Sequence, residues 1–154
     1  MRRAVVLLAT FGPVGYAPIA PATAGSAVVA AIGWFVPPPA LGVTIGLIAL
    51  GTAIAVWISG EAEKSLGHDA HPIVIDEAVG QSIALLGVPR ALPAFALSFL
   101  LFRLFDIWKP LGARELQRLS GGYGVVADDV VAGLTACGAF HVVAAVLARV
   151  GWNF

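Results

Sequence analysis

Residues 40–58 read ALGVTIGLIALGTAIAVWI, an uncharged apolar run that sets the class of this protein. A helix needs about 20 such residues to cross the ~30 Å of hydrocarbon in a bilayer. Val130 to Ala148 is a second run of that length, interrupted only by His141 and small residues. Both runs are rich in alanine and leucine and too long for strands. The sequence therefore predicts an all-α fold, a multi-helix integral membrane bundle.

Composition agrees with this class. The chain is 59% hydrophobic and 12% charged, whereas an ordinary soluble domain is about 25% charged. Nine basic and nine acidic residues cancel, so no basic face is available for nucleic acid and we expect no such partner. The 154 residues suit one domain, predicted over residues 1–154. The alternative is a compact bundle with unusually apolar helices.

Two further apolar segments are interrupted by prolines. Ala22 to Val36 is separated from the first run by Pro37 to Pro39, and Val79 to Phe102 is broken at Pro89 and Pro93. Proline cannot continue helical hydrogen bonding, so we expect short or broken helical hairpins. If both hairpins return to the side they left, every charged segment lies on that side. If Val79 to Phe102 spans fully, the acidic residues that flank it are separated.

Two acidic pairs stand at the edges of apolar segments: Asp76 with Glu77, and Asp128 with Asp129. Ionised carboxylates beside apolar helices are costly to dehydrate unless they are paired or bound to a cation. Mg²⁺ takes oxygen ligands from one or two carboxylates and completes its shell with water and phosphate oxygens. The pairs therefore predict a magnesium site. An alternative for Asp128 is an N-cap of the following helix.

The block FRLFDIWKP at residues 102–110 places Arg103, Asp106 and Lys109 at intervals of three, on one face of a helix that ends near Pro110. Arg103 and Lys109 would supply positive charge to a phosphate, while Asp106 joins the metal shell or holds the two bases. The alternative is a pair of surface salt bridges. Basic residues gather on one side of the predicted spans, which marks that side as cytoplasmic. They are Arg2, Arg3, Arg103, Lys109, Arg114 and Arg118.

Upstream, a glycine- and proline-rich loop from Gly12 to Ser26 runs into a helix. It can present backbone N–H groups and the hydroxyls of Thr23 and Ser26 to an anion, although a plain helix start is an equal alternative. His68, Asp69 and His71 could bind a transition metal, but a solvated turn is the better interpretation. The loops of cysteine and aspartyl phosphatases are absent, so the remaining route is attack by a metal-bound water.

Four blocks of the chain together resemble the phosphatidylglycerophosphatase A family of bacterial membrane phosphatases. They occur in order, with compatible spacing, and cover most of the chain. They are the loop Pro18 to Ser26, His68 with IVIDEAVG at residues 73–80, the 102–110 block, and GGYGVVADDVVAG at residues 121–133. The resemblance implies magnesium-dependent removal of the terminal phosphate from phosphatidylglycerophosphate, giving phosphatidylglycerol. It also implies a helical fold shared with smaller soluble relatives.

The leading hypothesis is therefore a lipid phosphatase of the bacterial inner membrane, multi-pass, with its active site facing the cytoplasm. Glu77 and Asp129 would bind Mg²⁺ with help from the other three acids, namely Asp76, Asp106 and Asp128. The rivals are a small transporter or channel subunit that uses intramembrane acids, and a membrane scaffold without catalysis. The sequence leaves open the number of metal ions, the general base, the acyl-chain preference and the oligomeric state.

Overall fold

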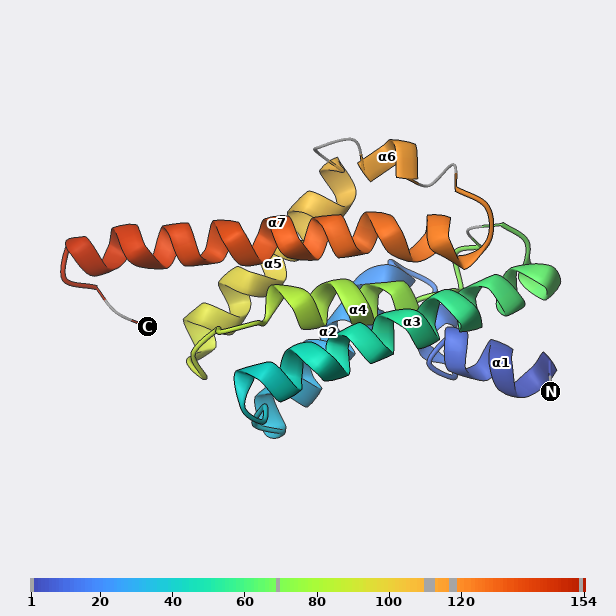
Figure 1. Ribbon diagram of the computed structural model, residues 1–154, viewed down its shortest axis with the longest axis horizontal. Helices are drawn as coiled ribbons and strands as arrows, with labels where there is room; N and C mark the ends of the chain where they lie inside the picture. The colour runs from blue at the N-terminus through green and yellow to red at the C-terminus, as the bar shows by residue number, and fades with distance from the viewer. Residues whose placement is uncertain (1, 69, 110–112, 117–118, 153) are drawn as a thin grey trace.

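The computed structural model describes residues 2–68, 70–109, 113–116, 119–152 and 154, and within these ranges its regular elements are helices (Figure 1). They are α1 (Arg2–Ala9), the short 3-10 helix η1 (Val14–Tyr16), α2 (Pro21–Phe35), α3 (Leu41–Leu66), α4 (Ile75–Ala84), α5 (Leu92–Trp108), α6 (Ala113–Leu116) and α7 (Gly122–Arg149). The prediction of an all-α fold is confirmed. α7 packs against α3, α4 and α5, so it forms the centre of the bundle.

Helices α3 and α7 are long and apolar enough to cross a membrane. They have 26 and 28 residues, which at 1.5 Å per residue gives about 39 and 42 Å. Only 11% and 22% of their apolar windows are buried inside the protein. The core helix of a soluble bundle buries its apolar stripe, whereas these helices turn most of theirs outward. The structure thus supports the membrane class over the compact soluble alternative.

The broken segment Val79 to Phe102 returns to the side from which it came. α4 ends at Ala84 and α5 begins at Leu92, after a turn that contains Pro89. The Ser98 hydroxyl of α5 donates to the Ala84 carbonyl at 2.8 Å. α4 has 10 residues and is about 15 Å long, too short to cross a bilayer. The expected hairpin is therefore present, and it brings the two ends of the segment together.

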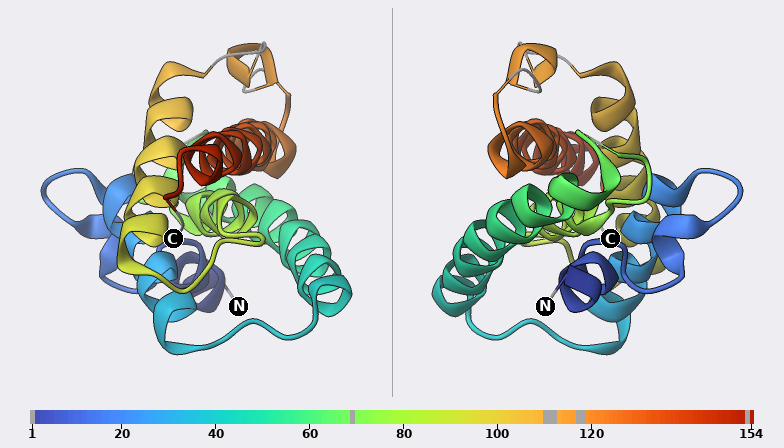
Figure 2. Two further views of the ribbon diagram at one scale, coloured as in Figure 1. Left: turned by 90° about the vertical axis from the view of Figure 1, so that its left-hand side faces the viewer. Right: turned by 90° about the vertical axis from the view of Figure 1, so that its right-hand side faces the viewer.

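The proline break between α2 and α3 also falls where the sequence placed it, but the two arms of this hairpin are splayed. α4 packs against both α2 and α3, and Figure 2 shows these two helices lying apart, joined by a long connection. α3 also continues beyond the predicted run to Leu66, where its last turns pack against α1. The splay leaves a space between the two helices that is lined by apolar side chains.

Two glycines bring α4 and α7 into close contact. A Cβ atom added to Gly133 would lie 2.4 Å from the Gly80 carbonyl oxygen, and one added to Gly80 would lie 2.8 Å from the Asp129 carbonyl oxygen. Both distances are shorter than any real contact of this kind, so only glycine allows this approach. Small residues serve the same purpose in membrane helix pairs generally. The contact sets the first turn of α4 beside the acidic turn of α7.

Gly133→Ala is expected to push the two helices apart and to destabilise the protein by roughly 1–3 kcal/mol, the usual cost of overpacking. Gly138→Ala is the matched control, because a Cβ atom at Gly138 on the same helix meets nothing within 4 Å. Its higher helix propensity should leave stability unchanged or raise it by up to about 1 kcal/mol. Thermal unfolding in detergent measures both. Equal melting temperatures for the two variants would show that the close contact is not required.

Candidate metal and phosphate site

The acidic residues that the sequence singled out meet at one end of the bundle. Asp76 and Glu77 lie in the first turn of α4, Asp106 in the last turn of α5, and Asp128 and Asp129 near the start of α7. All five side chains are buried. Their convergence confirms the geometric condition on which the predicted site depended.

The interpretation of Asp128 as an N-cap is wrong. α7 begins at Gly122, with Gly121 as its N-cap, so Asp128 lies inside the helix in its second turn. The helix starts earlier than predicted because the small residues Gly122 and Gly124 allow its first turn to pack closely. A Cβ atom on Gly122 would lie 1.9 Å from the Val56 carbonyl oxygen of α3. The acidic pair is therefore held by a buried helix rather than by a loop.

Two groups of carboxylates are arranged so that each could surround a cation. Asp76, Glu77 and Asp129 each offer an oxygen, and these oxygens lie within 4.8 Å of one another. Asp106, Asp128 and Asp129 do the same, so Asp129 belongs to both groups. Oxygens at ~2.1 Å from an octahedral Mg²⁺ are up to about 4.2 Å apart. The spacing of the oxygens in either group is therefore close to that of an octahedral Mg²⁺ shell.

The first group fits a cation in its hydrogen bonding as well as in its spacing. Within the described part of the chain, Asp76 Oδ1, Glu77 Oε2 and Asp129 Oδ2 are buried and have no hydrogen-bond partner. Burial raises the pKa of Asp76 well above its ordinary value, and the neighbouring Glu77 carboxylate raises it further. Burial also raises the pKa of Glu77. Buried carboxylate oxygens without donors are costly, and a divalent cation would remove that cost.

Two cations of the protein border this acidic group. The Arg103 guanidinium lies 2.9 Å from Asp106 Oδ2, and Lys109 Nζ lies 3.5 Å from Asp106 Oδ1 and is paired with Asp128. Burial alone would lower the pKa of Lys109, but its bond to Asp128 and the nearby carboxylates raise it to about 12. The side chains of Arg103 and Asp106 are only 11% and 10% exposed. The alternative of surface salt bridges is therefore wrong.

Acidic side chains outnumber basic ones at this end of the bundle. Five buried carboxylates face the two fixed positive charges of Arg103 and Lys109, which leaves a formal deficit of three when all are ionised. One divalent cation reduces this deficit to one. A cation with a partly neutralised shell also lets a phosphate approach, because it offsets the repulsion between the carboxylates and the phosphate oxygens.

The two hydroxyls of the predicted anion loop have different positions. Ser26 is fully buried; its Oγ donates to the Ala22 carbonyl at 3.0 Å and accepts a bond from Arg103 at 3.2 Å. Ser26 therefore lies behind Arg103 and holds it. Thr23 lies half-buried in the first turn of α2, where the N–H groups of a helix start have no partner within the helix. The start of α2 could therefore offer N–H groups to an anion.

Several predictions concern residues at the margin of the site. Among the described residues, the clusters with metal-ligand spacing consist of carboxylates and include no histidine. His68 follows the end of α3; its side chain is 57% exposed, and its Nδ1 lies 2.5 Å from Glu63 Oε1. Asp69, Pro110 and Arg118 lie outside the described residues, as does the side chain of Arg114. The solvated-turn interpretation of the histidines is thus supported for His68.

Sequence reasoning missed Gln81. It is fully buried one turn after Glu77 on the same face of α4, and neither its Oε1 nor its Nε2 has a hydrogen-bond partner among the described residues. The sequence did offer a signal: Gln81 is an amide four residues after Glu77, in an otherwise apolar stretch. The glycine contact between α4 and α7 was also missed, because a small residue in an apolar run has no distinctive pattern.

Comparison with known proteins connects this geometry to a family. A family model described as Phosphatidylglycerophosphatase A matches residues 7–144. The chain belongs to the phosphatidylglycerophosphatase A family. The match includes every carboxylate and base of the site, and the resemblance noted in the sequence is confirmed. Membership of the phosphatidylglycerophosphatase A family makes the chain a phosphatase, which removes the support for a transporter or a scaffold.

Individual relatives agree with the family and differ in their printed names. A Bacteroides thetaiotaomicron protein named "Putative phosphatidylinositol-3-phosphatase" is 41% identical over 84% of this chain and 86% of its own length. The Phosphatidylglycerophosphatase A proteins of Escherichia coli and Haemophilus influenzae are 36% and 39% identical over 62% of this chain. The matches cover 57% and 62% of those two relatives, less than two thirds of either. No solved structure matches the chain.

Proposed function

We propose that this chain is a magnesium-dependent phospholipid phosphatase that hydrolyses the terminal phosphate monoester of phosphatidylglycerophosphate to give phosphatidylglycerol. The observation that carries the proposal is the convergence of Asp76, Glu77 and Asp129, with buried oxygens that lack donors, beside Arg103 and Lys109. A carboxylate cluster next to fixed positive charge is suited to bind a cation and a phosphate together.

Glu77 and Asp129 would hold the Mg²⁺, with Asp76, Asp106 and Asp128 close enough to assist. When bound, the metal supplies a Lewis acid for the phosphate and lowers the pKa of a water molecule. Arg103, Lys109 and the start of α2 would orient the phosphate oxygens. The oxygen of water forms a bond to phosphorus, the bond from phosphorus to the glycerol oxygen breaks, and the glycerol oxygen leaves with a proton.

Asp76 is the carboxylate best suited to accept the proton of the attacking water. A general base must lie within hydrogen-bond reach of the proton it accepts, and Asp76 Oδ1 is buried without a partner in the group of oxygens that includes Glu77 and Asp129. It lies in the same turn as Glu77, so the proton acceptor and the metal ligand are on one rigid element. Lys109 stays charged, since its pKa is about 12, and therefore serves the phosphate rather than the proton transfer.

We further propose that the protein is a multi-pass protein of the bacterial inner membrane whose active site faces the cytoplasm. Arg103 and Lys109 lie at the site end of the bundle, which the positive-inside tendency assigns to the cytoplasm. Exposed aromatic side chains in the last turn of α5, in the first turn of α7 and on the part of α3 beside that turn support an interfacial position. They are Trp57, Trp108 and Tyr123, each more than half exposed.

The proposal is tested with the purified protein in detergent micelles that contain phosphatidylglycerophosphate. Phosphate release with Mg²⁺, and none after addition of EDTA, is the expected result. Phosphatidylinositol 3-phosphate belongs in the same assay, because the Bacteroides thetaiotaomicron relative is named as a phosphatase of that lipid. Ion flux across proteoliposomes without any hydrolysis would contradict the proposal and favour the transporter.

Arg103→Lys is expected to lower kcat/KM by roughly 10²-fold. Lysine keeps the charge but loses the planar guanidinium, whose Nη1 contacts both Asp106 and Ser26 and whose other N–H groups could bind the phosphate. Arg149→Lys is the matched control, because Arg149 is exposed in the last turn of α7, at the end of that helix opposite to Asp128 and Asp129. Initial rates of phosphate release measure both variants. Equal kcat/KM for Arg103→Lys and the wild type would remove Arg103 from the phosphate site.

A further inference from the structure

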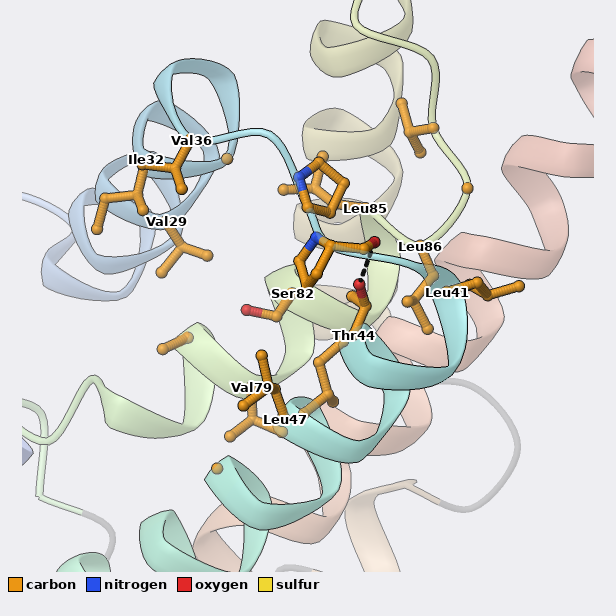
Figure 3. Close-up of a pocket in the computed structure, with 18 of the residues that line it drawn as sticks. Val29, Ile32, Val36, Leu41, Thr44, Leu47, Val79, Ser82, Leu85 and Leu86 are labelled. Atoms are coloured by element: carbon orange, nitrogen blue, oxygen red, sulfur yellow. Dashed lines mark hydrogen bonds between the residues drawn. The ribbon is translucent and has the colours of Figure 1, made fainter.

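An apolar groove lies between the splayed helices α2 and α3, and α4 forms its third wall. Its volume is about 690 Å³, within the ~300–1,000 Å³ typical of small-ligand pockets. Figure 3 shows Ile32 of α2, Leu47 of α3 and Val79 of α4 on its three walls. The proposed hydrolysis uses none of these side chains, so it does not account for the groove.

The groove is suited to hydrocarbon rather than to water or to a polar ligand. The polar groups at its far end are already used by the protein: the Thr44 hydroxyl donates to the Pro39 carbonyl at 3.1 Å, and Arg90 donates to the Trp34 carbonyl. The Ser82 hydroxyl also lines the groove, but a water molecule needs two to four polar partners, which one hydroxyl does not supply. Leu47 and Ile54 of α3 are 56% and 45% exposed, so this wall is open toward the membrane.

The groove has the length and the direction of an acyl chain. Along α3 its wall runs from Ala55 to Leu41, which at 1.5 Å per residue is about 21 Å. Half of the hydrocarbon thickness of a bilayer is ~15 Å. The far end of the groove is marked by Pro38 and Arg90, both in turns opposite the acidic site. A chain that enters at the site end can therefore lie along the groove for its full depth.

The near end of the groove reaches Ile75, the first residue of α4, which directly precedes Asp76. Successive residues of a helix are about 100° apart, so Glu77 projects from the side of α4 opposite to Val79, while Asp76 lies between these two faces. The groove and Glu77 are thus separated by the width of one helix, which is about 10–12 Å with its side chains. They are joined around the N-terminal end of α4.

We propose that this groove holds one acyl chain of the phospholipid substrate, while the headgroup passes over the N-terminal end of α4 to the carboxylates. The inference rests on the proposed function and names how the substrate of that site is held. A phosphodiester and a glycerol separate the acyl chains from the terminal phosphate of phosphatidylglycerophosphate, and this spacer bridges the width of α4. Because lipid tails are as apolar as the groove, burial itself gains little. The groove acts by fixing where the terminal phosphate lies.

Gly51→Phe tests the proposal by filling the groove. Gly51 lines it, and a Cβ atom there meets nothing within 4 Å. Gly46→Phe is the matched control on the same helix, because Gly46 also has open space but does not line the groove. With long-chain phosphatidylglycerophosphate, Gly51→Phe should lower kcat/KM at least about tenfold, since misplacement by 1 Å can cost ~10²-fold. With the deacylated headgroup, glycerophosphoglycerophosphate, it should match the wild type. Gly46→Phe should match the wild type with both.

Two results would overturn the groove assignment. One is an unchanged rate for Gly51→Phe with the long-chain lipid, and the other is an equal loss with both substrates, which would indicate damage to the site or the fold. Melting temperatures of the two variants, measured alongside, identify a folding defect.

A second measurement needs no catalysis. Phosphatidylglycerophosphate with a diazirine in one acyl chain should cross-link to peptides that contain Leu47 or Ser82 in the wild type and in Gly46→Phe, but not in Gly51→Phe. If the wild type releases no phosphate yet cross-links in this pattern, the proposed function fails and the groove assignment stands. Cross-links spread evenly over the exposed faces of α3 and α7 would overturn the assignment.

Discussion

Asp129→Asn is expected to reduce phosphate release by about 10³-fold or more while the protein still inserts and folds. Asp129 is the residue shared by both carboxylate groups, so its replacement weakens every cation position that the cluster offers. Asparagine keeps the size of the side chain but not the charge, and the loss of one charge-stabilising group alone costs about 10²–10³-fold in typical enzymes. Loss of the metal removes the activation of water as well.

The stability of this variant should change in the opposite direction. The buried carboxylate of Asp129 lies among other acids and has an oxygen without a donor, so removing its charge is expected to leave the metal-free melting temperature unchanged or higher. Glu61→Gln is the control, because Glu61 pairs with the exposed Lys64 on α3 and belongs to neither carboxylate group. Full activity of Asp129→Asn would show that Asp129 is not part of the active site.

Magnesium is expected to raise the melting temperature of the wild type, and more so at about pH 8 than at about pH 6. A ligand at 100 times its Kd stabilises the folded state by about 2.7 kcal/mol. Burial raises the pKa of Asp76 and Glu77, so above the ordinary carboxyl pKa of about 4 the metal-free folded protein holds more protons than the unfolded chain. Its stability therefore falls as the pH rises, and Mg²⁺, which takes the place of those protons, offsets the fall.

The comparison that decides this prediction is the shift in melting temperature between Mg²⁺ and EDTA at each pH. Using the difference cancels the other titrating groups, which contribute equally with and without metal. Asp129→Asn should show little or no shift at either pH. A wild-type melting temperature that does not respond to Mg²⁺ at any pH would contradict both the metal site and its proposed ligands.

Some features of the fold followed from the sequence because they depend on local composition. The run from Ala40 to Ile58 predicted a spanning helix without any tertiary information, and the prolines at 37–39 and at 89 placed the turns. Whether Val79 to Phe102 returned could not be decided, because a proline break is compatible with a kinked span and with a hairpin. The Ser98 to Ala84 bond and the packing of Phe102 on Gly80 settle that question.

The residues of the candidate site were predicted better than their environment. Acids at the edges of apolar runs are conspicuous, and so is a block with Arg103, Asp106 and Lys109 at intervals of three. The start of α7 at Gly122 and the splay of α2 and α3 depend on backbone contacts between distant segments. Gly80 meets Gly133 across such a contact, and nothing in the local pattern of either glycine indicates its partner.

The shortness of α4 has a consequence for how the enzyme would meet its lipid. If α4 begins at the cytoplasmic surface, its length of about 15 Å matches one half of the hydrocarbon thickness. On the proposed orientation, the groove and the catalytic carboxylates would then draw from one leaflet, the one in contact with the cytoplasm. Substrate would enter sideways from that leaflet and product would return to it. No lipid would have to flip, and dephosphorylation would leave the number of lipids on each side of the membrane unchanged.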